Sequence, residues 1–372
     1  MGGSGTVGRA AVRALRGLGP DAVRLRLGGR RPRALREMAE AAGPVAEAVP
    51  VDCGDPAGLA AFCAGCRVVL NCAGPSYLLL DRVARAALTA GADYVDVAGD
   101  DPVHERLATS GLMGTARTAV LSAGILPGLS GLLPRWLART AVTPPRRLSV
   151  WAGGLEPCGT TVATDLVLSL DRGGSQGAPY AAAGASWREG RPTAGGLRGA
   201  RGVELPFFPG PVTIHPALSG EAVRLATGLG LSEVDWFSVF AGDHLYAALT
   251  RLRAHPPTTP ARLAAAAAEV VRAADLDLVG RAPYYRMLLA LDGVAASRTA
   301  VLAAVGSHRI TGAMGALAVA AVLSGEVPTG LHYAADALDP VRTVDALREV
   351  CAPLVLEVFD GPPAECLDEV VL

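Results

Sequence analysis

Three glycines near the beginning of the chain, Gly3, Gly5 and Gly8, fit the pattern G-x-G-x-x-G, and a helix-like run follows over residues 9–18. In a βαβ unit the first glycine makes a tight turn, the second lets the backbone approach a pyrophosphate, and the third lets the helix pack closely on the sheet. The helix N-terminus then offers its N–H groups to the phosphates. Only Met1 and Gly2 precede the motif, so we expect a dinucleotide-binding turn whose first strand is apparently missing.

Short strands and helices are predicted to alternate from residue 23 to residue 122. Val23, Leu25 and Leu27 alternate with arginines, which is typical of a half-buried strand, whereas the run 68–70 is continuously apolar, as in a buried parallel strand. This alternation predicts a Rossmann-type, doubly wound parallel sheet with its ligand outside the carboxyl ends of the strands. The expected strands are 23–27, 45–51, 67–71, 94–97 and 119–122, and the expected helices are 33–42, 56–63, 78–90 and 102–106.

The second half of the chain has a different character, because hairpin signals replace the regular alternation. We expect a Rossmann domain over residues 1–124, an α+β domain with a mixed or antiparallel sheet over 125–310, and C-terminal helices over 311–372 that return to the first domain. The expected strands are 147–152, 203–208, 212–215 and 234–240, with hairpins at 186–191 and 284–305; the expected helices are 129–140, 161–170, 260–275, 312–323 and 339–350.

The composition excludes several kinds of chemistry. The net charge of −1 provides no basic field for nucleic acid. All 34 basic residues are arginine, so a Schiff-base lysine, a Walker-A lysine and a Tyr-x-x-x-Lys pair are impossible. The seven cysteines are scattered, which favours reduced thiols in a cytoplasmic protein. The most apolar late run, 312–323, is too short to span a membrane. Cys63 and Cys66 form a C-x-x-C, but no second pair or nearby histidine completes a zinc site, and no two histidines or His/Cys pair show ligand spacing, so we expect no metal.

The end of the second predicted strand bears on the choice of cofactor. NAD sites place an acidic residue about twenty positions after the glycines. Here that position holds Gly29-Arg30-Arg31 instead, and a guanidinium at Arg30 suits a 2′-phosphate, which favours NADP over NAD. The alternative is that both arginines are simply solvated at the start of a helix. Asp52 either accepts a hydrogen bond from the adenine amino group or caps the next helix.

Several segments, taken in order, resemble the saccharopine dehydrogenase-like oxidoreductases over residues 2–132. They are Gly3-Ser4-Gly5-Thr6-Val7-Gly8, Gly29-Arg30, Val51-Asp52, Val69-Leu70-Asn71-Cys72-Ala73-Gly74-Pro75, Ala92-Asp93-Tyr94-Val95-Asp96-Val97-Ala98-Gly99-Asp100 and Ala123-Gly124-Ile125-Leu126-Pro127-Gly128. The resemblance implies an NAD(P)-binding domain, a mixed-sheet substrate domain that often mediates dimerisation, and hydride transfer at a C–N bond of a small molecule. We therefore expect a homodimer. The chain departs from the family pattern in its apparently missing first strand and its lack of lysine, so any lysine-dependent mechanism cannot operate.

The resemblance also implies roles for individual residues. The pyrophosphate would lie against Gly3, Ser4, Gly5, Thr6, Val7 and Gly8, and Arg30 would meet the 2′-phosphate. The segment past the ribose towards the nicotinamide would comprise Asn71, Ala73, Gly74 and Pro75. The reactive crevice would be bordered by Gly99, Asp100, Gly124, Pro127 and Gly128.

Acid–base chemistry has two candidates. His215 follows a rigid apolar segment, Phe207-Phe208-Pro209-Gly210-Pro211, and histidine titrates near neutrality; it is otherwise a core or surface histidine. Asp100 lies at a strand end and either exchanges protons or caps a helix. Tyr284 and Arg286 either hold a substrate carboxylate or are exposed strand residues.

We expect an NADP-dependent reductase of a C=N group. The alternatives are reduction of a C=C bond in a carrier-bound intermediate, and a non-catalytic nucleotide-binding protein.

Overall fold

The computed structural model describes residues 1–19, 23–114, 116–142 and 144–366. The chain divides into two compact units, of which the first comprises Met1–Leu132 and Ser307–Ala352 and the second Leu133–Gly306 with the segment from Pro353 onwards. The segment predicted to return to the first domain is therefore shared between the units. Its helices belong to the first unit, whereas a strand at its end belongs to the second.

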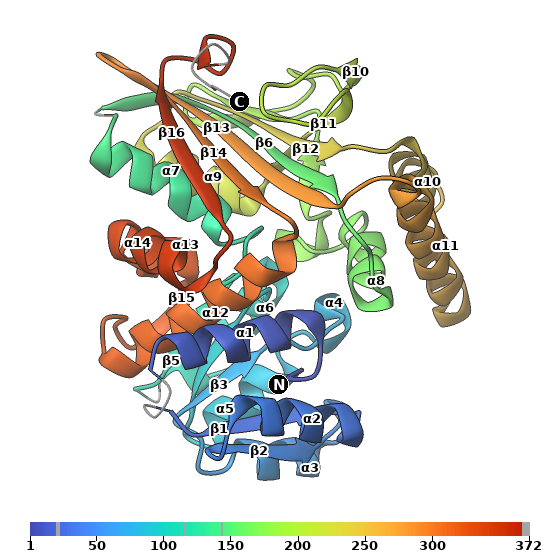
Figure 1. Ribbon diagram of the computed structural model, residues 1–372, viewed down its shortest axis with the longest axis vertical. Coiled ribbons are helices and arrows are strands. Elements are labelled where there is room, and N and C mark those ends of the chain that lie inside the picture. Colours follow the sequence, from blue (N-terminus) through green and yellow to red (C-terminus); the bar gives the residue numbers. More distant parts are fainter. Residues whose placement is uncertain (20–22, 115, 143, 367–372) are drawn as a thin grey trace. The chain divides into compact units, whose positions relative to one another are not determined.

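The first unit is an α/β structure in which every strand pair is parallel, as the alternating pattern predicts (Figure 1). Strands β1 and β2 pair with each other, and β3, β4, β5 and β15 form a second sheet in the order β15-β5-β4-β3. The strands are β1 (Leu25–Gly29), β2 (Ala46–Pro50), β3 (Val68–Asn71), β4 (Asp93–Asp96), β5 (Thr118–Leu121) and β15 (Gly330–Tyr333).

Helices flank these strands, and α1 packs along α12. A Cβ on Gly312 of α12 would lie 2.6 Å from the Cβ of Ala10 on α1, so this glycine permits the close approach of the two helices. The helices are α1 (Thr6–Gly17), α2 (Pro32–Ala42), α3 (Pro56–Cys63), α4 (Ser76–Leu79), α5 (Arg82–Thr89), α6 (Asp101–Ala108), α12 (Ser307–Ser324), α13 (Ala334–Ala337) and α14 (Pro340–Val350).

Two features of this unit differ from expectation. The helix predicted over 78–90 is two helices, because Leu80 between α4 and α5 has a φ of 50°, which ends a right-handed helix. Strand β15 was not predicted. Its four residues are all only partly buried, so the segment lacks the apolar run of the other strands.

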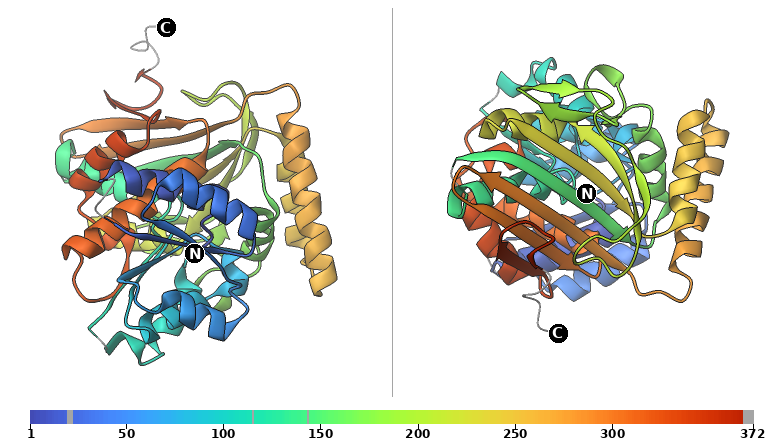
Figure 2. Two further views of the ribbon diagram at one scale, coloured as in Figure 1. Left: turned by 60° about the horizontal axis from the view of Figure 1, so that its bottom comes forward. Right: turned by 90° about the horizontal axis from the view of Figure 1, so that it is seen from above.

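The second unit is built on a mixed sheet with the order β10-β11-β12-β6-β13-β14-β16, onto which the right-hand view of Figure 2 looks. The β6–β12 pair is parallel and the other pairs on this path are antiparallel. The strands are β6 (Pro145–Leu155), β7 (Ala181–Ala183), β8 (Ser186–Arg188), β9 (Arg191–Thr193), β10 (Ala200–Val203), β11 (Val212–Ser219), β12 (Glu233–Phe240), β13 (Tyr284–Gly293), β14 (Ser297–Ala304) and β16 (Val355–Asp360). The helices are α7 (Leu129–Thr140), which begins just before the unit boundary, α8 (Thr160–Ser169), α9 (Gly220–Leu229), α10 (Asp243–Ala254) and α11 (Pro260–Leu278).

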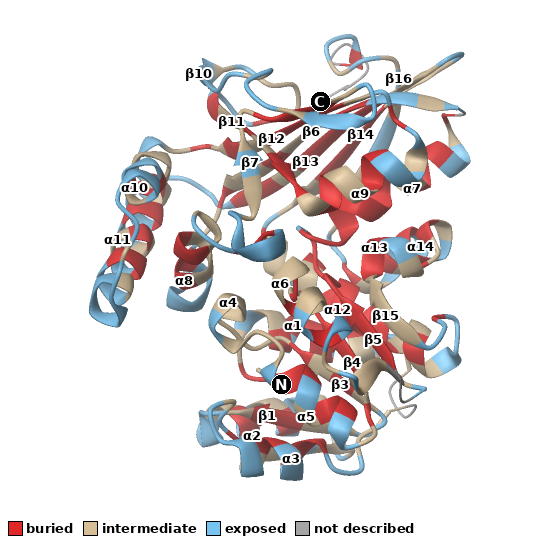
Figure 3. Ribbon diagram, turned by 180° about the vertical axis from the view of Figure 1, so that it is seen from behind, coloured by how far each residue is buried: buried red, intermediate tan, exposed pale blue. Residues whose placement is uncertain are grey.

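The predicted α+β class and both hairpins are confirmed, and the buried residues follow the strands (Figure 3). The strand predicted over 203–208 is wrong: β10 ends at Val203, and Phe207 has a φ of 67° within a turn. Helices α9 and α10 and strand β16 were not predicted. No helix within the described residues is long and apolar enough to cross a membrane.

Candidate functional site

The glycine turn lies at the carboxyl ends of β1 and β3. The Gly3 N–H donates to the Gly28 carbonyl at 3.0 Å, and the Gly5 N–H donates to the Gly2 carbonyl at 2.9 Å. A Cβ on Gly8 would lie 2.2 Å from the Gly2 carbonyl oxygen, so only glycine lets α1 begin this close to the turn. The three glycines therefore make the tight strand–turn–helix connection that the motif predicts.

The N-terminus of α1 is open to an anion. Gly5 occupies its N-cap position without any side-chain cap, and the first turn holds no acidic residue. The first N–H groups of a helix have no partner within the helix, and together with the helix dipole they bind phosphate. The turn therefore fits a dinucleotide pyrophosphate in two ways: its glycines let the backbone come close, and the N–H groups of the helix have no side-chain cap.

Two arginines fix the turn. The Ser4 carbonyl accepts from Arg9 Nε and from Arg31 Nη2, both at 3.1 Å. Arg31 thus braces the glycine turn, a role that the sequence did not reveal because Arg30 and Arg31 are adjacent and chemically identical. The exposed Arg30 follows β1 and makes no hydrogen bond or ion pair within the described residues, so its guanidinium faces solvent beside the turn.

Asp52 follows β2 and is exposed. Its Oδ1 accepts from the Gly54 N–H at 2.7 Å, and it is Asp55 that caps α3 by accepting from Ala57 N–H at 3.1 Å. The capping alternative for Asp52 is therefore wrong.

A buried polar cluster joins the loops that follow β3 and β4. Asn71 donates from Nδ2 to Asp96 Oδ2 at 3.0 Å and accepts from the Ala73 N–H at 3.1 Å. The Asp96 carboxylate also accepts from the Tyr94 hydroxyl and from the Ala98 N–H. Burial raises the pKa of Asp96 above its ordinary value, although all three donors oppose that shift. Asn71 therefore positions the segment 73–75, and Asp96, which sequence reasoning passed over, positions Asn71.

The Asp100 carboxylate is also buried and already engaged. Its Oδ2 accepts from the Tyr77 hydroxyl at 2.7 Å and its Oδ1 from the Ser122 hydroxyl at 3.2 Å. Asp100 occupies the N-cap position of α6 without a side-chain capping bond. It therefore ties the loop after β4 to α4 and to the end of β5.

The segment 122–128 closes against this loop. A Cβ on Gly124 would lie 2.4 Å from the Val97 carbonyl oxygen, and a Cβ on Gly128, which has a φ of 126°, would lie 2.2 Å from the Ser122 carbonyl oxygen. Gly124, Pro127 and Gly128 are all buried. All the predicted cofactor residues and these three residues thus belong to the first unit.

The other predicted residues belong to the second unit. His215 lies on β11, half-buried, with its ring 6.1 Å from that of Tyr246; burial, with a smaller effect of Arg253, lowers its pKa. On β13, Tyr284 is buried and the Arg286 guanidinium lies 5.5 Å from the Tyr284 ring. The alternative that these two are simply exposed strand residues is therefore wrong, because Tyr284 is buried and Arg286 is half-buried.

Arg286 has small neighbours across the sheet. It pairs with Gly153 on β6 and with Ala303 on β14. Its Nη1 donates to the Tyr285 carbonyl at 3.0 Å, and burial lowers its pKa. Both cross-strand neighbours are thus small residues, and the guanidinium is half-buried beside the Tyr284 ring.

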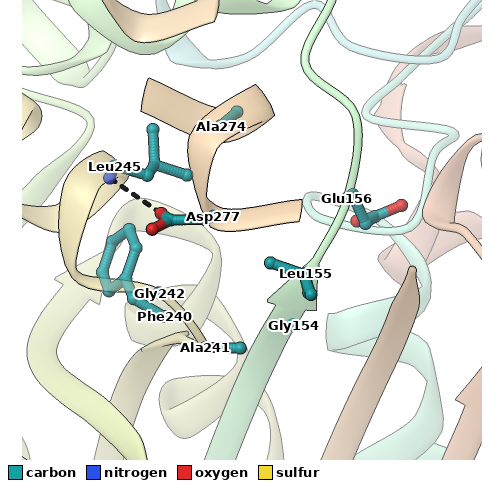
Figure 4. A pocket seen from close by; sticks show the side chains of 9 residues that line it. All are labelled: Gly154, Leu155, Glu156, Phe240, Ala241, Gly242, Leu245, Ala274 and Asp277. Carbon is teal, nitrogen blue, oxygen red and sulfur yellow. Dashed lines mark hydrogen bonds between the residues drawn. The ribbon is translucent and has the colours of Figure 1, made fainter. Parts of the chain in front are cut away.

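A pocket at the ends of β6 and β12 is centred on Asp277 (Figure 4). Asp277 accepts from the backbone N–H groups of His244 and Leu245 at 3.0 and 2.9 Å and contacts His244 Nδ1 at 2.8 Å, so it caps α10. The cavity measures about 10 Å³, which holds no more than one water. This pocket is too small for a substrate.

Comparison with known proteins agrees with this geometry. Residues 1–119 match the family model of the saccharopine dehydrogenase NADP binding domain. Among solved structures, apo saccharopine dehydrogenase (L-Glu forming) from Saccharomyces cerevisiae is similar with a TM-score of 0.64 at 13% identity, over 97% of this chain and 98% of that one. Homospermidine synthase from Legionella pneumophila, in complex with NAD, is similar with a TM-score of 0.57 at 12% identity, over 96% and 90%. No curated protein sequence matches the chain.

Proposed function

We propose that this chain, a saccharopine dehydrogenase-like NAD(P)-dependent oxidoreductase, uses NADPH to reduce a C=N group of a small, amino-acid-derived or natural-product substrate. The observation that carries the proposal is the uncapped N-terminus of α1 directly behind the glycine turn. Bound there, the cofactor would supply a hydride to the carbon of the C=N group, while the nitrogen takes up a proton to give an amine.

The preference for NADPH rests on Arg30. Its guanidinium is exposed at the end of β1, where an NAD site would place a carboxylate. Arg31 is already bonded to the Ser4 carbonyl, which leaves Arg30 as the group that pairs with a 2′-phosphate. The matching family model is that of an NADP-binding domain, and this supports the same choice.

The proton is assigned to His215 rather than to Asp100. Both oxygens of the Asp100 carboxylate already accept hydrogen bonds from hydroxyl groups, so its part is to hold the loops. The pKa of His215 is lowered from its ordinary value, so the ring is neutral at pH 7 and is suited to accept a proton during amine oxidation. In the reductive direction only the protonated ring can donate. The rate of reduction should therefore fall as the pH rises through the pKa of His215.

The register of the sheet separates Arg286 from His215. His215 pairs with Ser238, Ser238 with Ala152, and Ala152 with Met287, so His215 and Met287 share one face of the sheet. Arg286 is the neighbour of Met287 and therefore lies on the opposite face. We assign the proton to His215 and give Arg286 no part in that step.

The test combines binding with turnover. Purified protein is titrated with NADPH and NADH by fluorescence, and oxidation of NADPH is then followed with a panel of imines formed in solution from amino acids and 2-oxo acids or aldehydes. We expect NADPH to bind more tightly than NADH, and at least one imine to be reduced. His215→Gln should lose the pH dependence of turnover, whereas the matched change at the exposed His255 should not.

The result that overturns the proposal is tight NADPH binding without oxidation by any imine, which would favour the non-catalytic alternative. Turnover with conjugated C=C substrates and with no imine would instead favour the reductase of carrier-bound intermediates.

A further inference from the structure

Two adjacent tyrosines of β13 both have buried hydroxyl groups that lack a hydrogen-bond partner. Tyr284 is 8% exposed and Tyr285 is 5% exposed, and neither hydroxyl is bonded within the described residues. Leaving a buried hydroxyl unpaired is unfavourable, so each of them calls for an explanation. Because successive side chains of a strand point to opposite faces of the sheet, the two hydroxyls lie in different surroundings.

The register places Tyr285 on the face of the sheet that carries His215. His215 shares its face with Met287, and Tyr285 precedes Met287 by two residues on the same strand. Tyr284 belongs instead to the face of Arg286. Of the two unpaired hydroxyls, the one on Tyr285 therefore lies on the same side as the proposed proton donor.

The charges that act on the two hydroxyls differ in sign. Burial is the largest cause that raises the pKa of Tyr285, and Glu156 and then Glu221 raise it further. The charged groups that act on the pKa of Tyr284 are arginines, and they oppose the effect of burial. The Tyr285 hydroxyl thus lies in a field of negative charge, where the most favourable hydrogen-bond partner is a cationic donor.

Glu221 is buried although its place in a helix does not require burial. It lies in the first turn of α9, where an acidic residue interacts favourably with the helix dipole even when exposed. Glu221 is nevertheless only 5% exposed, and it lies among the buried residues of α9 together with Ala222 and Leu225. A carboxylate accepts up to about four hydrogen bonds, so it can bind a ligand in addition to a partner within the chain.

Glu156 follows the end of β6, the strand beside β13. Gly154, which pairs with Tyr285, precedes Glu156 by two residues. In Figure 4 the Glu156 side chain points away from Asp277, so it does not belong to the small pocket. Glu156 is half-buried and is the most accessible of the three groups. The acceptors around the Tyr285 hydroxyl therefore come from three separate elements, β13, α9 and the end of β6.

We propose that Glu156, Glu221 and the Tyr285 hydroxyl form a binding site for a primary ammonium group. An ammonium has three N–H donors, which match one hydroxyl oxygen and two carboxylates. Hydrogen bonds of this charge-assisted kind are the strong ones, and they would satisfy the buried hydroxyl.

The position of the site bears on the substrate. His215 and Tyr285 lie three strands apart on one face, with roughly 16 Å between their backbones. The ammonium therefore belongs to a part of the substrate well removed from the C=N group, and the substrate is an imine that carries a second, cationic nitrogen. This assignment to the substrate rests on the proposed function, whereas the ammonium site does not.

The experiment measures the binding of simple amines to the full chain without cofactor. Butylammonium is titrated by calorimetry at fixed ionic strength in an amine-free buffer, with butyrate and butanol as probes of equal length. We expect butylammonium to bind much more tightly than either probe. Tyr285→Phe and Glu221→Gln should each raise its Kd about tenfold or more, whereas the matched change at the exposed Glu357 should not.

Tyr284→Phe is the matched control for the tyrosine. It also removes a buried hydroxyl without a partner, but on the other face of the sheet, so the Kd for butylammonium should stay unchanged. Neither tyrosine variant loses a hydrogen bond seen in the described residues, so both should fold, and urea unfolding verifies this. Equal Kd values in Tyr285→Phe, Tyr284→Phe and the original chain would overturn the proposal. So would butylammonium binding no tighter than butanol.

Turnover separates the site from the proposed function. Imines formed from a diamine should have a lower KM than imines formed from a monoamine of equal length, and Tyr285→Phe should abolish this difference with little change in kcat. Equal KM values would overturn the assignment to the substrate. Butylammonium binding that depends on Tyr285, without turnover of any imine, would support the site and refute the proposed function.

Discussion

The glycine turn allows one substitution to be worked out from the structure in detail. In Gly8→Ala the new Cβ would lie 2.2 Å from the Gly2 carbonyl oxygen and 2.9 Å from the Gly3 Cα. Since Cβ contacts below 3.0 Å are essentially never seen, the start of α1 must retreat from the turn by at least about 0.8 Å. Strain of this kind costs about 1–3 kcal/mol.

The same movement withdraws the helix N–H groups from the phosphates. If the strain is relieved at the expense of binding, 1–3 kcal/mol corresponds to an increase of roughly 5- to 150-fold in the Kd for NADPH. Fluorescence titration measures Kd, and urea unfolding without cofactor measures the free energy of unfolding. We expect Gly8→Ala to raise the Kd for NADPH and to lower the free energy of unfolding.

The matched control is Gly17→Ala at the other end of the same helix. A Cβ on Gly17 meets nothing within 4 Å, and alanine is the better helix former by about 1 kcal/mol. This variant should therefore be slightly more stable than the original chain and bind NADPH unchanged. The reasoning is refuted if Gly8→Ala has both the original stability and the original Kd, or if the two variants lose affinity equally.

Three further outcomes follow from the same structure. Arg30→Asp should shift preference from NADPH towards NADH in fluorescence titration, whereas the matched change at the exposed Arg36 on α2 should not. Equal effects of the two changes would show that Arg30 does not bind the 2′-phosphate. The lowered pKa of His215 means that the folded state binds fewer protons than the unfolded state, so its contribution to stability is present above about pH 6.5 and is lost as the pH falls towards its folded pKa. His215→Gln should therefore lose less stability than the original chain between pH 7 and 5 in urea unfolding, and the exposed His255→Gln should behave like the original. Asn71→Ala should cost about 1–3 kcal/mol in urea unfolding and weaken NADPH binding, because it removes one donor from a buried carboxylate and one acceptor from a backbone N–H; an unchanged Kd would show that the loop after β3 does not contribute to the site.

The fold of the first unit was predictable because its information is local. Turn glycines, a proline at the start of α3 and short apolar runs each occur within a few residues, and strands joined by single helices admit few topologies. The second unit was harder, because the partners of its strands are far apart in the chain. Strand β16 pairs with β14 from more than fifty residues away, and most of its residues are exposed, so its apolar side chains do not mark one buried face.

The site divides in the same way. The glycine turn follows from spacing alone, but the brace from Arg31 to Ser4 depends on how two distant loops meet. The Asn71–Asp96 pair also joins the ends of neighbouring strands. The sequence signal for Asp96 is a carboxylate at the end of a predicted strand. Its bond to Asn71 could not be predicted, because it depends on the pairing of β3 with β4. Sequence therefore indicates which loops meet at the edge, but not which of their side chains bond to one another.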